Sequence, residues 1–291
     1  MAIFNFGSIN IDHVYRLQTL PRPGETIASR SLTLGLGGKG ANQSIAAALA
    51  GREVRHIGAM GEADGWALDR LRGAGVDVSR IARLPDEPTG HAIIMVEDSG
   101  ENAIVVHAGA NRAMAERAVL DALSEIGPAD TLLLQNETAH QQAAAAHARA
   151  AGARVIYSAA PFEVEAVRAV MPHVAILAVN AGEAAHLAAE LGANLPCEGM
   201  VVTLGARGAE YRDLRSGEVT SQGAFAVTPV DTTGAGDCFT GWFAAGLDAG
   251  QTAAGALRHA AAAAAMQVTR PGAADAMPTL AEVRAFMSRQ T

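Results

Sequence analysis

The sequence predicts an α/β fold built on a doubly wound, mostly parallel sheet flanked by helices, with a small β-sheet lid. Along most of the 291 residues, short β-branched runs alternate with alanine-rich stretches of helical length. This alternation is typical of a doubly wound sheet. Several of the strand-like runs are apolar throughout, as expected where helices cover both faces of a parallel sheet.

The alternation assigns most of the chain to one α/β domain spanning residues 1–291, without an internal repeat or a long linker. Six runs are expected to be strands of the main sheet: 2–7, 53–58, 131–135, 154–157, 174–179 and 200–204. Eight stretches are expected to be helices: about 40–51, 64–74, 114–126, 138–152, 181–191, 235–250, 252–268 and 279–289. Alanine is the best helix former, so a closely packed helix explains the tract at 260–265.

Two segments interrupt this alternation and are expected to form the lid. Residues 13–36 contain a proline- and glycine-rich stretch followed by an alternating run. Residues 89–110 hold two strand-like runs joined by Asp98-Ser-Gly-Glu101, which indicates a hairpin turn. Together the segments predict a small antiparallel sheet beside the ligand-binding end of the main sheet.

The composition argues against several classes of protein. The chain has 22 basic and 30 acidic residues, for a net charge of −8. Nucleic-acid binding normally needs a concentrated basic surface, so we expect no nucleic-acid partner. No apolar run approaches the ~18 residues of a membrane span, and the first ten residues do not resemble a signal peptide. The two cysteines, Cys197 and Cys238, suit a reducing compartment, so we expect a cytoplasmic protein.

The chain contains 21 arginines and a single lysine, Lys39, which lies in the glycine-rich segment Gly35-Leu-Gly-Gly-Lys-Gly40. Arginine does not replace lysine where a compact point charge is needed, so Lys39 is a candidate functional residue. The glycine spacing also matches a dinucleotide fingerprint, which would favour a nicotinamide-dependent oxidoreductase with Glu62 on the ribose. However, the segment does not directly follow the first strand, and no strand is expected to end at Glu62. We favour a close-approach loop that lets a polar ligand lie against backbone amides.

A second glycine-rich segment, Asp231-Thr-Thr-Gly-Ala-Gly-Asp237, precedes a helical run. Glycines at a helix entrance expose N–H groups near the positive end of the helix dipole, which can bind a phosphate group. A carboxylate in the same turn could remove a proton from an attacking hydroxyl. A simple capping aspartate at a flexible turn is the alternative, although two aspartates exceed what capping requires.

Five collinear segments resemble the signature motifs of the PfkB-type carbohydrate kinases. They are GSINID at 7–12, GGKGANQ at 37–43, GENAIVVHAGAN at 100–111, DTTGAGD at 231–237 and VTRPG at 268–272. The resemblance covers nearly the whole chain and is greatest to members that phosphorylate pentoses. It implies transfer of a phosphoryl group from ATP to the primary hydroxyl of a pentose, with O5 of D-ribose as the first candidate. Another sugar or a nucleoside remains an alternative, and a non-catalytic sugar-binding protein is a more distant one.

The same resemblance implies roles for individual residues. Asp237 would be the catalytic base, beside an anion hole formed at Gly234, Ala235 and Gly236. The sugar would be held by Asn10, Asp12, Gly38, Lys39, Asn42 and Glu137. The magnesium ion and the nucleotide would lie along Asn180, Glu183, Thr203, Gly205, Arg207, Gly208 and Gly236. Asp12, Glu137 and Asn180 would each follow a strand, at the sheet edge where open α/β sheets bind ligands.

The resemblance also implies a monovalent cation, K⁺, beside the anion hole. Its ligands would be Asp231 and the backbone carbonyls of Thr233, Gln267, Arg270 and Gly272. Ala276 stands where the family pattern offers a serine hydroxyl, so we expect weakened K⁺ binding with activation retained. Exposed lid strands commonly pair between copies, which favours a homodimer formed through the lid.

Overall fold

The computed structural model describes residues 1–192 and 194–290, and its main element is a nine-stranded sheet. The strands follow the order β13-β12-β11-β10-β9-β8-β1-β4-β5, and every neighbouring pair from β11 to β5 is parallel. Their bounds are β1 (Ile3–Phe6), β4 (Val54–Gly61), β5 (Val76–Leu84), β8 (Thr131–Gln135), β9 (Arg154–Ser158), β10 (Ile176–Asn180), β11 (Gly199–Thr203), β12 (Ala209–Asp213) and β13 (Val219–Gln222). The predicted fold class is confirmed.

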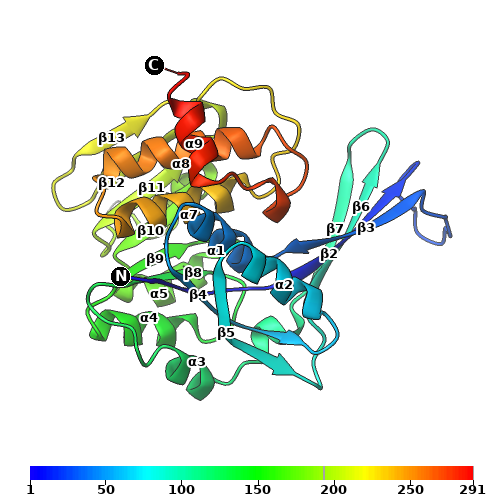
Figure 1. Cartoon of the computed structure of the whole chain (residues 1–291), viewed down its shortest axis with the longest axis horizontal. Helices are drawn as coiled ribbons and strands as arrows, with labels where there is room; N and C mark the ends of the chain where they lie inside the picture. Colours follow the sequence, from blue (N-terminus) through cyan, green and yellow to red (C-terminus); the bar gives the residue numbers. More distant parts are fainter. Residues whose placement is uncertain (193, 291) are drawn as a thin grey trace.

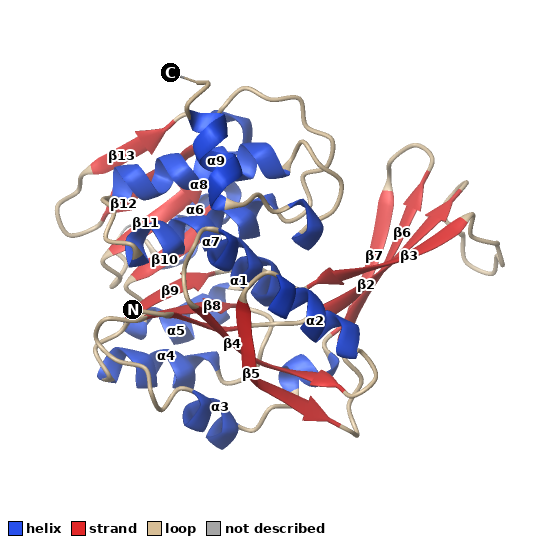
Figure 2. Cartoon of the chain, viewed as in Figure 1, coloured by secondary structure: helices blue, strands red, loops and turns tan. Residues whose placement is uncertain are grey.

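Helices cover both faces of this sheet and bury two hydrophobic cores (Figures 1 and 2). One core contains residues of α1 (Lys39–Leu49), α2 (Gly65–Gly73), α7 (Ala235–Asp248), α8 (Ala253–Gln267) and α9 (Leu280–Met287). The other contains residues of α3 (Glu116–Ala122), α4 (Gln141–Ala150), α5 (Val164–Val170) and α6 (Ala181–Leu191). Strands such as β8 are buried along their whole length because each face packs on helices.

A separate four-stranded sheet projects from the main body, as Figure 1 shows. Its order is β3-β2-β6-β7, with bounds β2 (Asn10–Leu17), β3 (Ser31–Gly37), β6 (Gly90–Glu97) and β7 (Asn102–His107). The two predicted lid segments therefore form one small sheet. The expectation of a wholly antiparallel sheet is wrong, because β2 pairs with β6 in parallel. β2 follows β1 and β6 follows β5 along the chain. Because β1 and β5 run in the same direction in the main sheet, β2 and β6 do so as well.

Most predicted elements lie within a few residues of the observed ones, and each missed element has a weak local sequence signal. The strand β5 alternates buried and exposed residues because it lies at an edge of the main sheet. The strands β12 and β13 are short and polar at the opposite edge. The helix α5 is rich in valine, whose branched side chain lowers helix propensity. In the part of the chain that the structure describes, no helix is long and apolar enough to cross a membrane.

Candidate functional site

The two glycine-rich motifs form the N-termini of α1 and α7, and these helices pack against each other. Gly38 precedes α1 with a φ of 90°, and Gly234 precedes α7 with a φ of 76°. These are left-handed conformations that favour glycine. A Cβ at Gly38 would also lie 2.8 Å from the backbone nitrogen of Asn10. The glycines therefore let two chain reversals approach closely and bring both helix entrances to one place.

The carboxylate of Asp237, in the first turn of α7, is held by two amide side chains of α1. Asn42 Nδ2 donates to Asp237 Oδ2 at 3.0 Å, and Gln43 Nε2 donates to Asp237 Oδ1 at 2.9 Å. Gln43 is fully buried, and its Oε1 accepts from Gln135 Nε2 at 2.8 Å. Gln135 Nε2 also donates to Asn5 Oδ1 at 2.9 Å. This buried chain fixes the orientation of Gln43 and, through it, of the carboxylate.

The surroundings of Asp237 favour its protonated form more than water would. Removal from solvent raises the pKa of Asp237, although the Lys39 charge and the hydrogen bonds from Asn42 and Gln43 act in the opposite direction. The first turn of α7 also presents backbone N–H groups that lack intrahelical acceptors. Ala235 N–H donates to Thr232 O at 3.2 Å, so Gly236 and Asp237 supply the more available amides of the expected anion hole.

Glu137, which follows β8, joins the glycine-rich loop to the end of β1. Its Oε2 accepts from the Lys39 backbone N–H at 3.0 Å and from the Ser8 hydroxyl. Its Oε1 lies 3.2 Å from Lys39 Nζ. Burial alone would lower the pKa of Lys39, but the charges of Glu137, Asp237 and Asp12 outweigh it and raise that pKa. The single lysine is therefore kept in its charged form by its contact with Glu137 and by the nearby charges of Asp237 and Asp12.

We expected Asn10 and Asp12 directly after the first strand. The structure places both of them in β2 of the small sheet. Burial and the nearby charge of Glu137 raise the pKa of Asp12 to about 6, against a smaller opposing effect of Lys39. Asn10 is buried, and its Oδ1 accepts from Asn111 Nδ2 at 2.7 Å. Asn111 also bonds both backbone groups of Ile9, so it anchors the start of β2.

An open pocket of about 240 Å³ joins the α1 and α7 entrances to the ends of β10 and β11. Its walls include Lys39, Asn180, Glu183, Thr203, Gly234, Ala235, Gly236 and Asp237. The structure thus brings the predicted catalytic residues together with part of the predicted nucleotide site. Asn180 and Glu183 also form a capping box at the start of α6, which is the ordinary structural role of such a pair. Gly205, Arg207 and Gly208 lie just beyond β11 and do not line this pocket.

The residues expected around a monovalent cation also come together, but their donor set differs from the expected one. Asp231 accepts backbone hydrogen bonds from Thr233 and Gly272, each at 2.9 Å. The carbonyls of the same two residues accept from Gln267 Nε2, at 2.7 and 3.0 Å. Two expected cation ligands are therefore already bonded by a side-chain amide, and Ala276 adds no oxygen. This set does not fit a cation.

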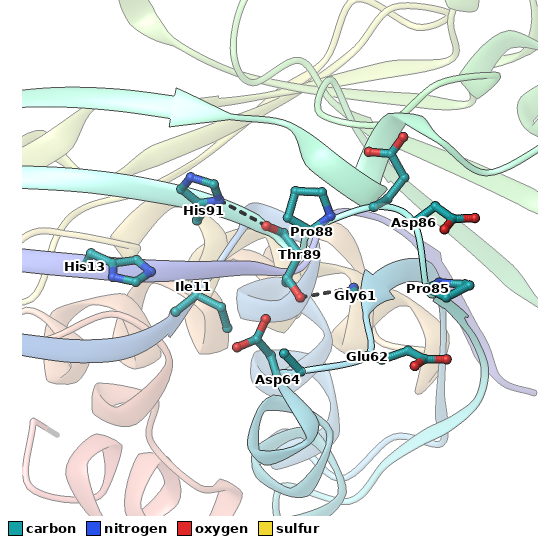
Figure 3. A pocket seen from close by; sticks show the side chains of 12 residues that line it. Ile11, His13, Gly61, Glu62, Asp64, Pro85, Asp86, Pro88, Thr89 and His91 are labelled. Atoms are coloured by element: carbon teal, nitrogen blue, oxygen red, sulfur yellow. Dashed lines mark hydrogen bonds between the residues drawn. The ribbon is translucent and has the colours of Figure 1, made fainter.

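A second cavity, of about 420 Å³, lies between the small sheet and the loops after β4 and β5 (Figure 3). Ile11 and His13 line it, and successive side chains of a strand point to opposite faces, so it lies across the sheet from Asn10 and Asp12. Glu62 lines it too. The expectation that no strand ends at Glu62 is wrong, because β4 extends to Gly61. The glycine-rich loop nevertheless follows β3, which belongs to the small sheet, so the dinucleotide interpretation lacks the βαβ unit of a parallel sheet that it requires.

Sequence reasoning missed several residues of the site. Ser8 lies inside the motif at 7–12 and Gln43 inside the motif at 37–43, but neither was singled out. The polar side chain directly after Asn42 was a signal that could have identified Gln43. Gln135 ends the buried strand β8, where a polar side chain is unusual. Asn42 was expected to hold a ligand, whereas the structure bonds it to Asp237.

Comparison with known proteins agrees with this arrangement of sheet and site. The family model for the pfkB family carbohydrate kinases matches residues 2–280. A ribokinase from Haemophilus influenzae is 34% identical over 298 residues, covering 97% of this chain and 96% of the relative. The fold and site define a carbohydrate kinase. The chain belongs to the pfkB family.

Two solved structures are similar along their whole length. A ribokinase from Cryptococcus neoformans in complex with ADP has a TM-score of 0.85 and 33% identity, covering 98% of this chain and 99% of that chain. An Arabidopsis thaliana ribokinase complexed with ribose and ATP has a TM-score of 0.87 and 29% identity, covering 98% of each chain.

The raised pKa of Asp12 predicts a trade-off between stability and binding. Between about pH 4 and 6 the folded protein binds this proton more tightly than the unfolded chain, so the free energy of unfolding falls as the pH rises through that window. Asp12→Asn should therefore raise the Tm at about pH 8 and leave it nearly unchanged at about pH 4. The same variant should bind the sugar more weakly.

Thermal unfolding at both pH values, together with the KM for the sugar, checks this prediction. Asp77→Asn is a suitable control, because hydrogen bonds lower the pKa of Asp77 and its removal should reduce the Tm at neutral pH. A Tm for Asp12→Asn below that of the wild type at about pH 8 would contradict the prediction.

Proposed function

We propose that the protein transfers the γ-phosphoryl group of ATP to the primary hydroxyl of a pentose, D-ribose at O5, giving D-ribose 5-phosphate and ADP. One observation carries the proposal most directly. The Asp237 carboxylate is fixed by α1 at the junction between the polar group around Glu137 and Lys39 and the pocket at the N-terminus of α7. A base at that junction can reach a hydroxyl on one side while a phosphate lies on the other.

The sugar would bind between the small sheet and the α1 loop. Asp12 and Glu137 offer carboxylate oxygens to its hydroxyls, and Lys39 offers an ammonium group. The backbone of Gly38 can approach closely because it has no side chain. Asn10 lies two positions before Asp12 in β2, on the same face of the strand, and would complete this set. Asn42 donates through Nδ2 to Asp237, and its Oδ1, which has no hydrogen-bond partner, can accept from a sugar hydroxyl.

The proposed chemistry needs one proton acceptor and one electrostatic site. The hydroxyl proton passes to Asp237 as the hydroxyl oxygen forms a bond to the γ-phosphorus and the bond to the bridging oxygen of ADP breaks. The raised pKa of Asp237 suits an acceptor that holds a proton during transfer. The amides of Gly236 and Asp237, at the positive end of α7, stabilise the transferred phosphoryl oxygens.

The nucleotide would extend along the pocket toward β11, past Thr203, with Gly205, Arg207 and Gly208 beyond it. Magnesium usually binds through one or two carboxylates together with the phosphates. Glu183 lines the same pocket beside Asn180, so this donor set fits a magnesium ion that arrives with ATP. Bound there, the ion would neutralise phosphate charge. A monovalent cation is not part of this proposal, because the residues expected to hold it do not fit one.

Two features support the wider setting of the proposal. Both cysteines are buried and free, which suits a cytoplasmic enzyme with access to ATP. The similarity to a ribokinase complexed with ribose and ATP supports the pentose assignment. A phosphorylation screen over pentoses, hexoses and nucleosides with magnesium-ATP tests that assignment. Faster turnover of a nucleoside or another sugar than of ribose would overturn the substrate and leave the kinase class intact.

The role of Asp237 is tested by Asp237→Asn. This variant keeps the size of the side chain but cannot accept the proton, so kcat should fall by about 10²–10⁴-fold while ATP binding and the Tm change little. A capping residue would instead cost roughly 1 kcal/mol of stability and little catalysis. Turnover at more than about a tenth of the wild-type rate would exclude Asp237 as the base.

We also propose that the small sheet is a lid over the sugar and that two copies of the chain pair through it. Several large apolar side chains of β3, β6 and β7 are exposed: Leu32, Leu34, Ile93, Ile104, Val105 and Val106. The sheet also has two open edges, β3 and β7. Exposed apolar strands with open edges favour association with another strand or sheet.

The pairing predicts a dimer in solution that charge on the lid would disrupt. Leu34 and Val105 share one face of the small sheet, because Leu34 is paired with His13, His13 with Ile93, and Ile93 with Val105. The double change Leu34→Asp and Val105→Asp should convert the dimer to a monomer at micromolar concentration, as measured by light scattering. Val219→Asp, at an equally exposed position on β13, should leave the dimer intact. A wild-type monomer would contradict the proposal.

A further inference from the structure

The Gln267 side chain connects two loops that flank the α7 entrance. Gln267 is the last residue of α8 and is fully buried. Its Nε2 lies 2.7 Å from the carbonyl oxygen of Thr233 and 3.0 Å from that of Gly272. An ion chelated by both carbonyls would have to approach the same two oxygens from the space between them. The amide nitrogen therefore takes a position that a bridging cation would otherwise take.

The orientation of this amide follows from its neighbours. Turning the side chain by half a rotation would bring Oε1 against two carbonyl oxygens, and three acceptors cannot bond one another. With Nε2 facing the carbonyls, both of its hydrogens have acceptors. Gln267 Oε1 is buried without a hydrogen-bond partner. The two bonds made by the NH₂ group are therefore the interactions that favour this buried amide.

The charge of Asp231 is compensated without a metal ion. The Thr233 and Gly272 N–H groups donate to its carboxylate, each at 2.9 Å. Each of its oxygens accepts from one of these two N–H groups. The carboxylate thus already bridges the same two loops through their N–H groups, while Gln267 bridges them through their C=O groups.

The remaining expected ligand position offers no donor. Ala276, in the short helix η4 (Ala274–Ala276), is 1% exposed and presents a buried methyl group. A hydroxyl there would be needed to complete a shell of oxygen ligands. The chain therefore lacks a side-chain ligand at Ala276 and carries a bridging amide at Gln267. Both differences weaken a cation site between these loops.

The bridged loops are those that shape the anion hole. Thr233 immediately precedes Gly234, the N-cap of α7, and a Cβ at Gly234 would lie 2.8 Å from the Cβ of Ala273. The segment at 272–273 therefore packs directly against the helix entrance. Holding Thr233 and Gly272 together fixes the place where the Gly236 and Asp237 amides face the pocket.

We propose that the Gln267 amide replaces a monovalent cation as the bridge between these loops, so that the enzyme works at full rate without K⁺. Gln267 is then a positioning residue for the anion hole. The kinetic part of this inference rests on the proposed kinase function, whereas its thermal part does not. Removing the amide leaves the Thr233 and Gly272 carbonyls without this donor, so it should expose a site that a cation can enter.

The test compares the wild type with Gln267→Ala/Ala276→Ser, in buffers containing tetramethylammonium chloride or an equal concentration of KCl. The wild-type kcat and Tm should be the same in both. The double variant should lose about tenfold or more of its kcat without K⁺, because two partly buried carbonyls lose their donor, and should recover with KCl. Its Tm should rise in KCl and not in tetramethylammonium chloride.

Ala276→Ser alone is the matched control, because it adds the hydroxyl and leaves the amide bridge in place; it should respond to K⁺ no more than the wild type does. Activation of the wild type by K⁺, or a K⁺-specific rise in its Tm, would overturn the inference. So would a double variant whose kcat and Tm match the wild type without K⁺. If no sugar or nucleoside is phosphorylated, the proposed function fails, and the Tm comparison still decides whether Gln267 takes the cation's place.

Discussion

The close packing of α1 on α7 is the constraint on which the rest of the site depends. A methyl group at Gly241 would lie 2.6 Å from the Cβ of Ala46 and from the carbonyl oxygen of Gln43, so only glycine allows the observed approach. That approach lets Asn42 and Gln43 reach Asp237 across the helix pair. Without it, the loops proposed to hold the sugar and the phosphate would belong to separate surfaces.

The second constraint is electrostatic. Asp12, Glu137 and Asp237 surround one ammonium group, and partly desolvated carboxylates so close together oppose one another's ionisation. Burial is the main cause of the raised pKa values of Asp12 and Asp237, and the charge of Glu137 adds to it. Such an arrangement lowers stability and is retained where a ligand or a reaction uses it. In the proposed function, the hydroxyls of a sugar would donate to these carboxylates, and Asp237 would accept the proton of the reacting hydroxyl.

The sequence predicted the layers of the fold well because apolar strands and alanine-rich helices carry strong local signals. The strand at 131–135 and the helix at 181–191 have the predicted bounds. Elements at the edges of the sheet were missed, since half-exposed strands such as β5 lack a continuous apolar run. The parallel pairing of β2 with β6 depends on the places of β1 and β5 in the main sheet, because β2 follows β1 and β6 follows β5. No local sequence pattern encodes those places.

The motifs also identified the site, but they did not determine which partner each side chain bonds. Asn42 and Asp237 are 195 residues apart, and only the folded chain shows that they bond each other. The family pattern marks the backbone carbonyl of Gln267 and says nothing of its side chain, which proves to bridge two of the other carbonyls. Roles that depend on backbone geometry were easier to anticipate than roles that depend on the direction of one amide.

A double-mutant cycle between Gln43 and Asp237 tests most directly whether α1 acts on the chemistry through the Asp237 carboxylate. The measured quantity is kcat for Gln43→Ala, Asp237→Asn and the two combined, with the Tm confirming that each variant is folded. If Gln43 serves to orient the base, it has nothing to orient in the asparagine variant. The combined variant should then be within about threefold of Asp237→Asn alone. Losses that multiply in full would contradict the account.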